Sequence, residues 1–312
     1  MNPLRRELLS RDGMFLLVGA VTMLFLALDT YVSHLSGGVV RGVEWIPVYF
    51  GVPAGVLLLA AGLLSIRSRP AALPIATVVY VASIAVGAAG AYFHWVRLVV
   101  PALPWVPNLT GKPFLWVPPV LAPLAFGLVG VLGLSALLQE SPPGSGVVRL
   151  LPRRTIALPL SKQRAYLLLV TLGILLAVVS ASLDHAHEGL RFPWMWAATA
   201  AGVFAAVAVL FYALEQRPAS EHRASVTAAL LVLIATGLVG EYMHLTADYA
   251  LAQDKLVFEK FVRGAPPLAP LLYAYMATLG LLAILPIEAW ASSLRLSRNE
   301  SPRERTADPA KS

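Results

Sequence analysis

The stretch AYLLLVTLGILLAVVSASLD (residues 165–184) contains a single charged residue, Asp184, which is also its last. An apolar run of about 20 residues is the length that an α-helix needs to cross the hydrocarbon core of a bilayer. Backbone N–H and C=O groups in lipid must pair within their own segment, so this run predicts a transmembrane helix. The fold class then depends on how many such runs the chain has.

Eight runs of this kind follow one another, at about 14–35, 46–66, 72–97, 118–139, 165–184, 194–214, 224–247 and 267–290. Hydrophobic residues make up 58% of the chain and charged residues 13%, whereas about 25% of a soluble domain is charged. The sequence therefore predicts an all-α polytopic membrane protein with eight transmembrane helices. We expect a first four-helix unit (1–139), a basic linker (140–164), a second four-helix unit (165–296) and a disordered cytoplasmic tail (297–312).

The distribution of basic residues predicts the orientation. With eight spans, 17 of the 24 Lys and Arg residues fall on the side that also holds both termini. The other seven are Arg41, Arg97, Lys112, Arg191, Lys255, Lys260 and Arg263. Because cytoplasmic loops carry the excess of Lys and Arg, both termini are predicted to be cytoplasmic, as in a bacterial-type inner-membrane protein. This asymmetry explains the net charge of +7 without a nucleic-acid partner.

The absence of cysteine limits the chemistry of any site. The chain has no Cys residue, which excludes disulfides, thiolate metal ligands, iron–sulfur clusters and covalent c-type haem attachment. A metal ion bound by this protein must be held by imidazole, carboxylate or carbonyl groups.

An eight-residue motif occurs twice and indicates an internal repeat. Residues 87–94 (GAAGAYFH) and 237–244 (GLVGEYMH) both read G-x-x-G-x-Y-x-H, in the third and seventh predicted spans. The fourth and eighth spans share a Phe…Pro-Pro…Pro pattern, and the first and fifth end in an acid followed by a histidine. Three matched features in the same order predict two tandem four-helix repeats that insert the same way up. A site in one repeat would then have a counterpart on the same face of the membrane.

Ionisable residues gather at the outer ends of the odd-numbered spans. On a helix, residues three, four and seven apart share one face. Asp184, His187 and Glu188 therefore project together from the fifth span. Glu241, His244 and Asp248 project together from the seventh in the same way. An ionisable group at this depth costs a few kcal/mol unless it is paired, so these residues predict a polar pocket inside the bundle.

The pocket has the ligand types of a transition-metal site. Imidazole and carboxylate groups suit Cu, Zn or Fe, and we predict Asp184, His187, Glu188 and His244 as the ligands. Residues that could orient those ligands, or form a weaker site in the first repeat, are Glu241, Asp248, His185, Asp29, His34 and His94. The first repeat is expected to be the weaker, since Ala91 stands where the second has Glu241.

Three other interpretations remain open. His94 and His244 are equivalent in the two repeats and could ligate one b-type haem between them. The pocket could instead be purely structural, in a structural or assembly subunit whose paired side chains hold the helices together. Transport is the third interpretation, although transporters usually bind their substrates near the midplane.

The functional prediction is an integral inner-membrane protein with an outward-facing His/carboxylate metal site. Such a protein could be one subunit of a membrane redox or oxygenase complex. Its expected partners are the lipid bilayer and either other membrane subunits or a periplasmic protein, with no nucleic acid.

Overall fold

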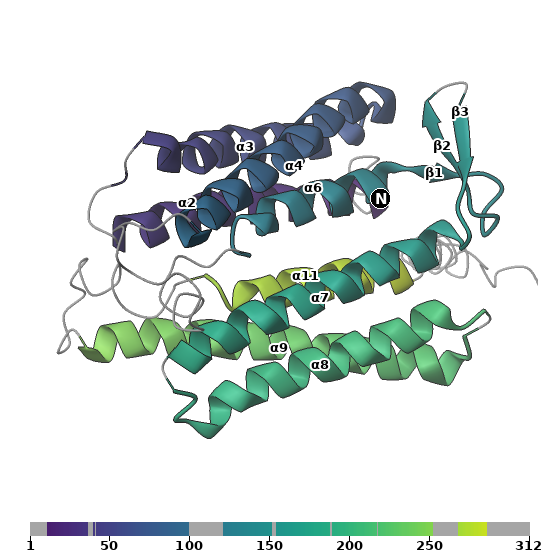
Figure 1. Ribbon diagram of the computed structural model, residues 1–312. Helices are drawn as coiled ribbons and strands as arrows, with labels where there is room; N and C mark the ends of the chain where they lie inside the picture. The colour runs from purple at the N-terminus through teal and green to yellow at the C-terminus, as the bar shows by residue number, and fades with distance from the viewer. Residues whose placement is uncertain are drawn as a thin grey trace, which may run out of the picture.

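The computed structural model describes residues 11–36, 40, 42–99, 121–151, 154–187, 189–216, 218–251 and 268–285. This part of the chain is almost entirely helical (Figure 1). Six of its helices are long and apolar enough to cross a membrane. They are α2 (Arg11–Ser36), α3 (Ile46–Ser65), α4 (Arg69–Val99), α7 (Lys162–His187), α8 (Pro193–Leu214) and α9 (Ser220–Leu251).

Two further helices are shorter. They are α6 (Leu124–Leu137) and α11 (Leu271–Ile284), each of 14 residues. At 1.5 Å per residue each is about 21 Å long, which is less than the roughly 30 Å of a hydrocarbon core. Each has a proline, Pro123 or Pro270, at its N-cap. Proline has no backbone N–H and cannot donate a helical hydrogen bond to the residue four positions earlier, so the helix does not continue towards the N-terminus. The six longer helices support six of the predicted transmembrane spans. The other two predicted spans, 118–139 and 267–290, include residues that lie outside the described part of the chain.

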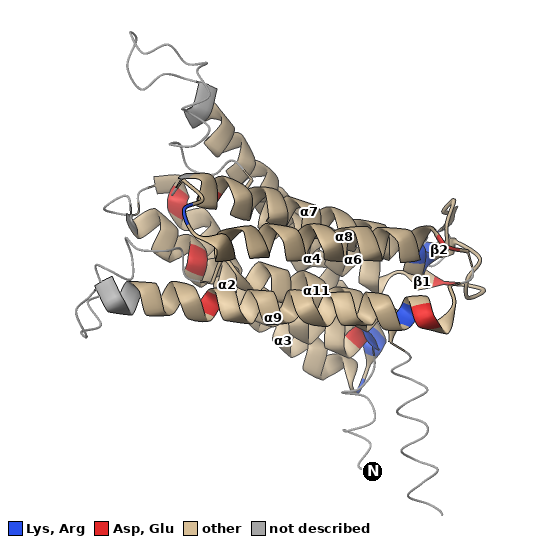
Figure 2. Cartoon of the chain, turned by 90° about the horizontal axis from the view of Figure 1, so that it is seen from below, with Lys and Arg blue, Asp and Glu red and all other residues tan. Residues whose placement is uncertain are grey.

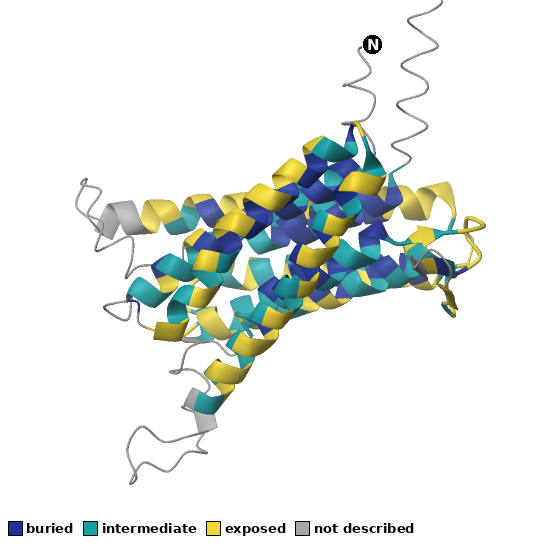
Figure 3. Ribbon diagram, turned by 90° about the horizontal axis from the view of Figure 1, so that it is seen from above, coloured by how far each residue is buried: buried dark blue, intermediate teal, exposed yellow. Residues whose placement is uncertain are grey.

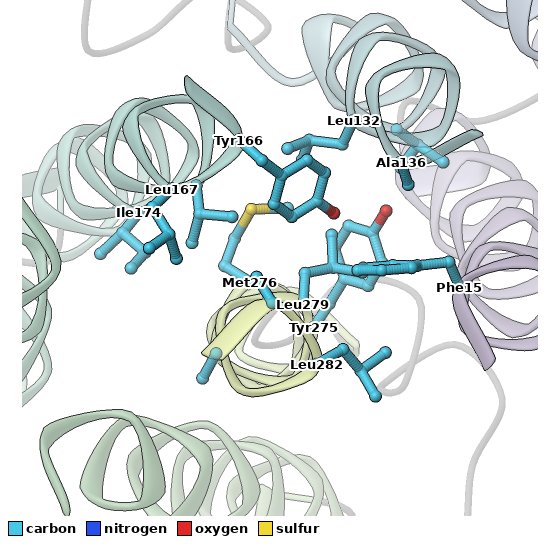
Figure 4. Close-up of a cluster of buried hydrophobic side chains, with 14 of the residues drawn as sticks. Phe15, Leu132, Ala136, Tyr166, Leu167, Ile174, Tyr275, Met276, Leu279 and Leu282 are labelled. Atoms are coloured by element: carbon cyan, nitrogen blue, oxygen red, sulfur yellow. The ribbon is translucent and has the colours of Figure 1, made fainter. Parts of the chain in front are cut away.

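The helices form two groups (Figure 1). The first half contains α2, α3, α4 and α6, and the second contains α7, α8, α9 and α11. The halves meet where α2 contacts α11 and α6 contacts α7. In this interface Phe15 of α2 and Tyr166 of α7 pack edge to face with ring centroids 5.3 Å apart. Figure 4 shows Met276 and Tyr275 of α11 beside them, and all four side chains are buried.

The outside of the bundle is apolar. Large hydrophobic side chains such as Val78 (69% exposed) and Phe211 (71% exposed) face outward, and Figure 3 shows exposed residues along the outer faces of the helices. Charged residues among those drawn in colour in Figure 2 lie towards the two ends, and the helices between them are drawn in the colour of uncharged residues. These are the features of a helical membrane protein, whose lipid-facing surface has no need to be polar.

A small sheet joins the two halves. Its three antiparallel strands are β1 (Gln139–Glu140), β2 (Val147–Leu151) and β3 (Arg154–Ala157). The sequence predicted a basic linker here (140–164), and the strands were not predicted. The carboxylate of Glu140 accepts N–H groups from Gly144 (2.9 Å), Gly146 (2.6 Å) and Lys162 (3.0 Å), so it ties the turn to the start of α7. Gly144 and Gly146 have φ values of 80° and 75°, a region that glycine adopts readily.

Basic residues near the sheet cap the C-terminal ends of helices. Arg69 pairs with Asp12 and donates to the carbonyl of Leu137. Arg164 donates to the carbonyls of Ala213 and Leu214, each at 2.7 Å. A cation at a helix C-terminus satisfies carbonyls that have no partner within the helix and interacts favourably with the helix dipole. These residues, predicted to be cytoplasmic, therefore also fix the ends of α6 and α8.

Candidate functional site

The glycines of the repeated motif let two helices in each half approach closely. A Cβ atom added to Gly87 would lie 2.4 Å from the backbone nitrogen of Gly127 in α6. A Cβ atom added to Gly237 would lie 2.9 Å from the carbonyl oxygen of Pro270, at the start of α11. Small residues are the usual means by which membrane helices come into backbone contact. The motif therefore fixes α4 against α6 and α9 against α11.

The tyrosine and the histidine of the motif point in different directions. They are two residues apart, which is about 200° around a helix. Tyr92 and Tyr242 are 62% and 68% exposed, as suits an aromatic ring at a membrane interface. His94 and His244 are only partly exposed, and each ring meets another histidine. The motif thus presents an imidazole to the inside of each half.

Two histidine pairs result, one in each half. The ring centroids of His34 (α2) and His94 (α4) are 6.2 Å apart with an interplanar angle of 77°. Those of His185 (α7) and His244 (α9) are 6.4 Å apart at 71°. All four residues lie near the C-terminal ends of helices that run away from the sheet. We call this end of the bundle, marked by these four histidines, the outer end.

His185 has features expected of a metal ligand. The backbone of Met195 in α8 interacts electrostatically with its ring. Its Nδ1 atom is buried and has no hydrogen-bond partner in the part of the chain that the structure describes. A ligating histidine usually anchors one ring nitrogen to a backbone or carboxylate oxygen and presents the other to the metal.

At the outer end, Asp29 interacts electrostatically with two other carboxylates. Asp29 of α2 interacts electrostatically with Glu241 of α9 and Asp184 of α7. Its Oδ1 atom is buried, and no described residue donates a hydrogen bond to it. Like charges repel most strongly where water is scarce, so this arrangement favours a bound cation or proton. Asp29 belongs to the first half and the other two acids to the second.

Glu241 also has a structural role that the sequence did not reveal. Its carboxylate accepts the backbone N–H of Leu268, with distances of 3.0 and 3.3 Å to its two oxygens. Leu268 has a φ of 68°, a left-handed conformation that is unfavourable for a leucine. Glu241, which is 9% exposed, thus holds the turn that precedes α11. The first half has Ala91 at the corresponding position of the motif.

The structure brings some of the predicted site residues together and leaves others undescribed. His244 and Asp184 are both at the outer end, and the ring that packs against His244 is that of His185. Glu188 and the side chains of His187 and Asp248 lie outside the described residues. Among the residues that are described, no three His, Asp or Glu side chains form a group that could hold a metal ion. The predicted four-residue ligand set therefore stays a prediction.

The haem interpretation pairs His94 with His244, whereas in the structure each of these histidines packs against another one. His94 contacts His34 and His244 contacts His185, so each histidine has a ring partner within its own half. The remaining histidine, His222, lies at the sheet end, where its Nδ1 atom is 2.7 Å from the Glu215 carboxylate.

Comparison of the chain with protein-family models, with curated proteins and with solved structures finds no match. The function must therefore be argued from the residues themselves.

Proposed function

We propose that this is a membrane protein that binds a transition-metal ion at its outer end, in the second half. His185 and His244 would supply imidazole ligands, and the predicted ligands Asp184, His187 and Glu188 would complete the set. Cu, Zn and Fe all accept imidazole and carboxylate ligands. The observation that carries the proposal is the His185–His244 pair, with the buried Nδ1 of His185 lacking a described hydrogen-bond partner.

The spacing of the two rings allows a shared ion that both rings approach from nearly opposite sides. A metal bound to an imidazole nitrogen lies about 2.0–2.1 Å from that nitrogen, hence about 3.2 Å from the ring centroid. Two imidazoles on one ion therefore have centroids about 5 Å apart in a tetrahedral site and at most about 6.4 Å apart when the two nitrogens lie opposite each other. The observed 6.4 Å equals that upper limit.

The charge of the nearby acids is consistent with a bound cation. Asp29 of the first half would be repelled by Asp184 and Glu241 of the second half if all three were ionised. A divalent cation would offset that repulsion, as would a bound proton. Asp29 and Glu241 would act as neighbouring acids that orient imidazoles or relay protons, as Asp248 could.

The proposal includes a tandem duplication. Helices α2 and α7 both have 26 residues, and α6 and α11 both have 14. A Cβ atom on Gly51 would meet Ala27, and one on Gly202 would meet Val178, which are contacts offset by the same 151 residues (202 − 51 and 178 − 27). We further propose a bacterial-type inner membrane with both termini cytoplasmic, so that the site faces the periplasm. A role as one subunit of a redox or oxygenase complex is consistent with that location.

A structural role for the pocket is the second candidate, and the contact between Glu241 and Leu268 favours it. In that case the polar residues hold α9 and α11 together, and the histidines pair only with each other. Such a protein would serve as a structural or assembly subunit.

Elemental analysis of protein purified in detergent without chelators tests the proposal. Wild type, after supplementation with Cu, Zn or Fe, is expected to carry at least one equivalent of metal, and the variants His185→Gln and His187→Ala/His244→Ala are expected to bind one equivalent less while remaining folded. His222→Gln, a histidine change at the sheet end, is the matched control and should keep the metal. Metal at background in every sample, together with a lower folding yield of the His244 variant, would overturn the proposal and support the structural role. Iron together with a Soret absorption band would show that the protein binds haem and not a single metal ion.

A further inference from the structure

The first half contains a histidine pair that the proposed function does not use. His34 and His94 repeat the geometry of His185 and His244, with centroid distances of 6.2 and 6.4 Å and interplanar angles of 77° and 71°. Sequence reasoning expected the first repeat to hold at most a weaker site, because it lacks the counterpart of Glu241. The geometry of the imidazoles does not show this weakening.

The two pairs also occupy matching places in their helices. His34 lies 23 residues after the first residue of α2 (34 − 11), and His185 lies 23 residues after the first residue of α7 (185 − 162). His94 and His244 end the same motif, whose glycines set α4 and α9 against the following helix. Four histidines therefore take two equivalent positions in each half, and a general tendency of histidine to lie at helix ends does not account for that match.

We infer that the protein binds two transition-metal ions at its outer end, the second of them between His34 and His94. This inference rests on the proposed function, because it assigns to the first pair the chemistry proposed for the second pair. The 6.2 Å separation fits two imidazoles that bind one ion from nearly opposite sides. Two imidazole ligands leave further coordination positions of such an ion for water or for a substrate.

The first half has no counterpart of Glu241, and this does not count against a metal site there. Glu241 uses its carboxylate to accept the N–H of Leu268, which is a local requirement of the turn before α11. Ala91 at the corresponding position therefore removes a turn contact and leaves both imidazoles of the first pair in place.

Metal stoichiometry tests the inference. Metal-free protein in detergent is dialysed to equilibrium against Zn²⁺, and separately against Cu⁺, and the bound metal is measured by elemental analysis. Two equivalents of at least one ion are expected in wild type. One equivalent is expected in His34→Gln/His94→Gln and one in His185→Gln/His244→Gln.

The outcomes separate this inference from the proposed function. One equivalent in wild type, unchanged by His34→Gln/His94→Gln, would overturn the second site and leave the proposed function intact. No bound metal in wild type would overturn both. Should a double variant fail to fold, histidine modification by diethylpyrocarbonate in the wild-type chain decides the matter. Metal must protect His34 and His94 from modification, with His222 as the unprotected control, and equal modification with and without metal would overturn the inference.

Discussion

The two halves of the bundle share their packing and their histidine pairs, and differ in their acids. Gly87 and Gly237 each bring a helix against the backbone of the next, and a histidine seven residues later meets a second imidazole in both halves. The acid of the motif is present only in the second half, as Glu241, where the first has Ala91. The shared residues are those that close helix contact and an imidazole pair require. The differing residue changes the charge and the turn before the last helix.

The two motif glycines differ in how closely the neighbouring helix approaches them, and substitutions at these glycines are expected to have the largest effect on stability. Gly87→Ala would place a Cβ atom 2.4 Å from the nitrogen of Gly127, whereas Gly237→Ala would place one 2.9 Å from the carbonyl oxygen of Pro270. Backbone atoms cannot move aside as a side chain can, so we expect Gly87→Ala to destabilise the protein by about 1–3 kcal/mol or more. Gly237→Ala should cost less. Thermal unfolding in detergent measures both.

Gly127→Ala is the control for that comparison. A Cβ atom on Gly127 would meet nothing within 4 Å, so this change should leave the melting temperature nearly unchanged. Equal melting temperatures for Gly87→Ala and Gly127→Ala would mean that α4 and α6 are not in backbone contact.

The role of Glu241 gives an intermediate effect. Glu241→Ala removes the acceptor of the Leu268 N–H, at an expected cost of about 1–3 kcal/mol. Glu241→Gln keeps an acceptor oxygen and should cost less, and Tyr242→Phe, on the exposed side of the same helix, should cost least. Thermal unfolding in detergent ranks the three. If Glu241→Gln is as unstable as Glu241→Ala, the charge of Glu241 matters more than its hydrogen bond.

The smallest effect is expected in the sheet that joins the halves. Burial acts to raise the pKa of Glu140, but the N–H groups of Lys162, Gly144 and Gly146, with the charge of Lys162, outweigh it, so the pKa lies below its usual 4.5. A carboxyl group whose pKa is lowered by folding stabilises the fold above its unfolded pKa and loses that contribution as the pH falls through the folded pKa. Hydrogen-exchange protection of the two glycine amides should therefore decrease on acidification below pH 4.5.

Glu140→Gln provides the comparison for this pH dependence. The variant should show weaker protection of Gly144 and Gly146 near neutral pH, and that protection should change little on acidification. The overall melting temperature should be almost the same as that of wild type, because the contact is local. Parallel pH profiles in the variant and wild type would show that a group other than Glu140 titrates.

Composition and the length of the apolar runs predicted the helical class. The short strands between 139 and 157 were not predicted, because strands of two to five residues between Pro and Gly have no periodicity to recognise. Helical spacing placed Asp184, His187 and Glu188 on one face. It could not give the rotation of α7 against α9, which brings His185 to His244.

X-ray absorption at the edge of the bound metal tests the central claim most directly, since it reports the ligands themselves. For the purified, metal-loaded protein we predict nitrogen or oxygen ligands at about 2.0–2.1 Å, together with the outer-shell scattering of imidazole rings. The amount of bound metal should fall in His185→Gln/His244→Gln and stay the same in His222→Gln, with imidazole scattering in every spectrum. A metal spectrum without imidazole scattering, or a metal content that is the same in all three proteins, would contradict the assignment of the histidine pairs as metal ligands.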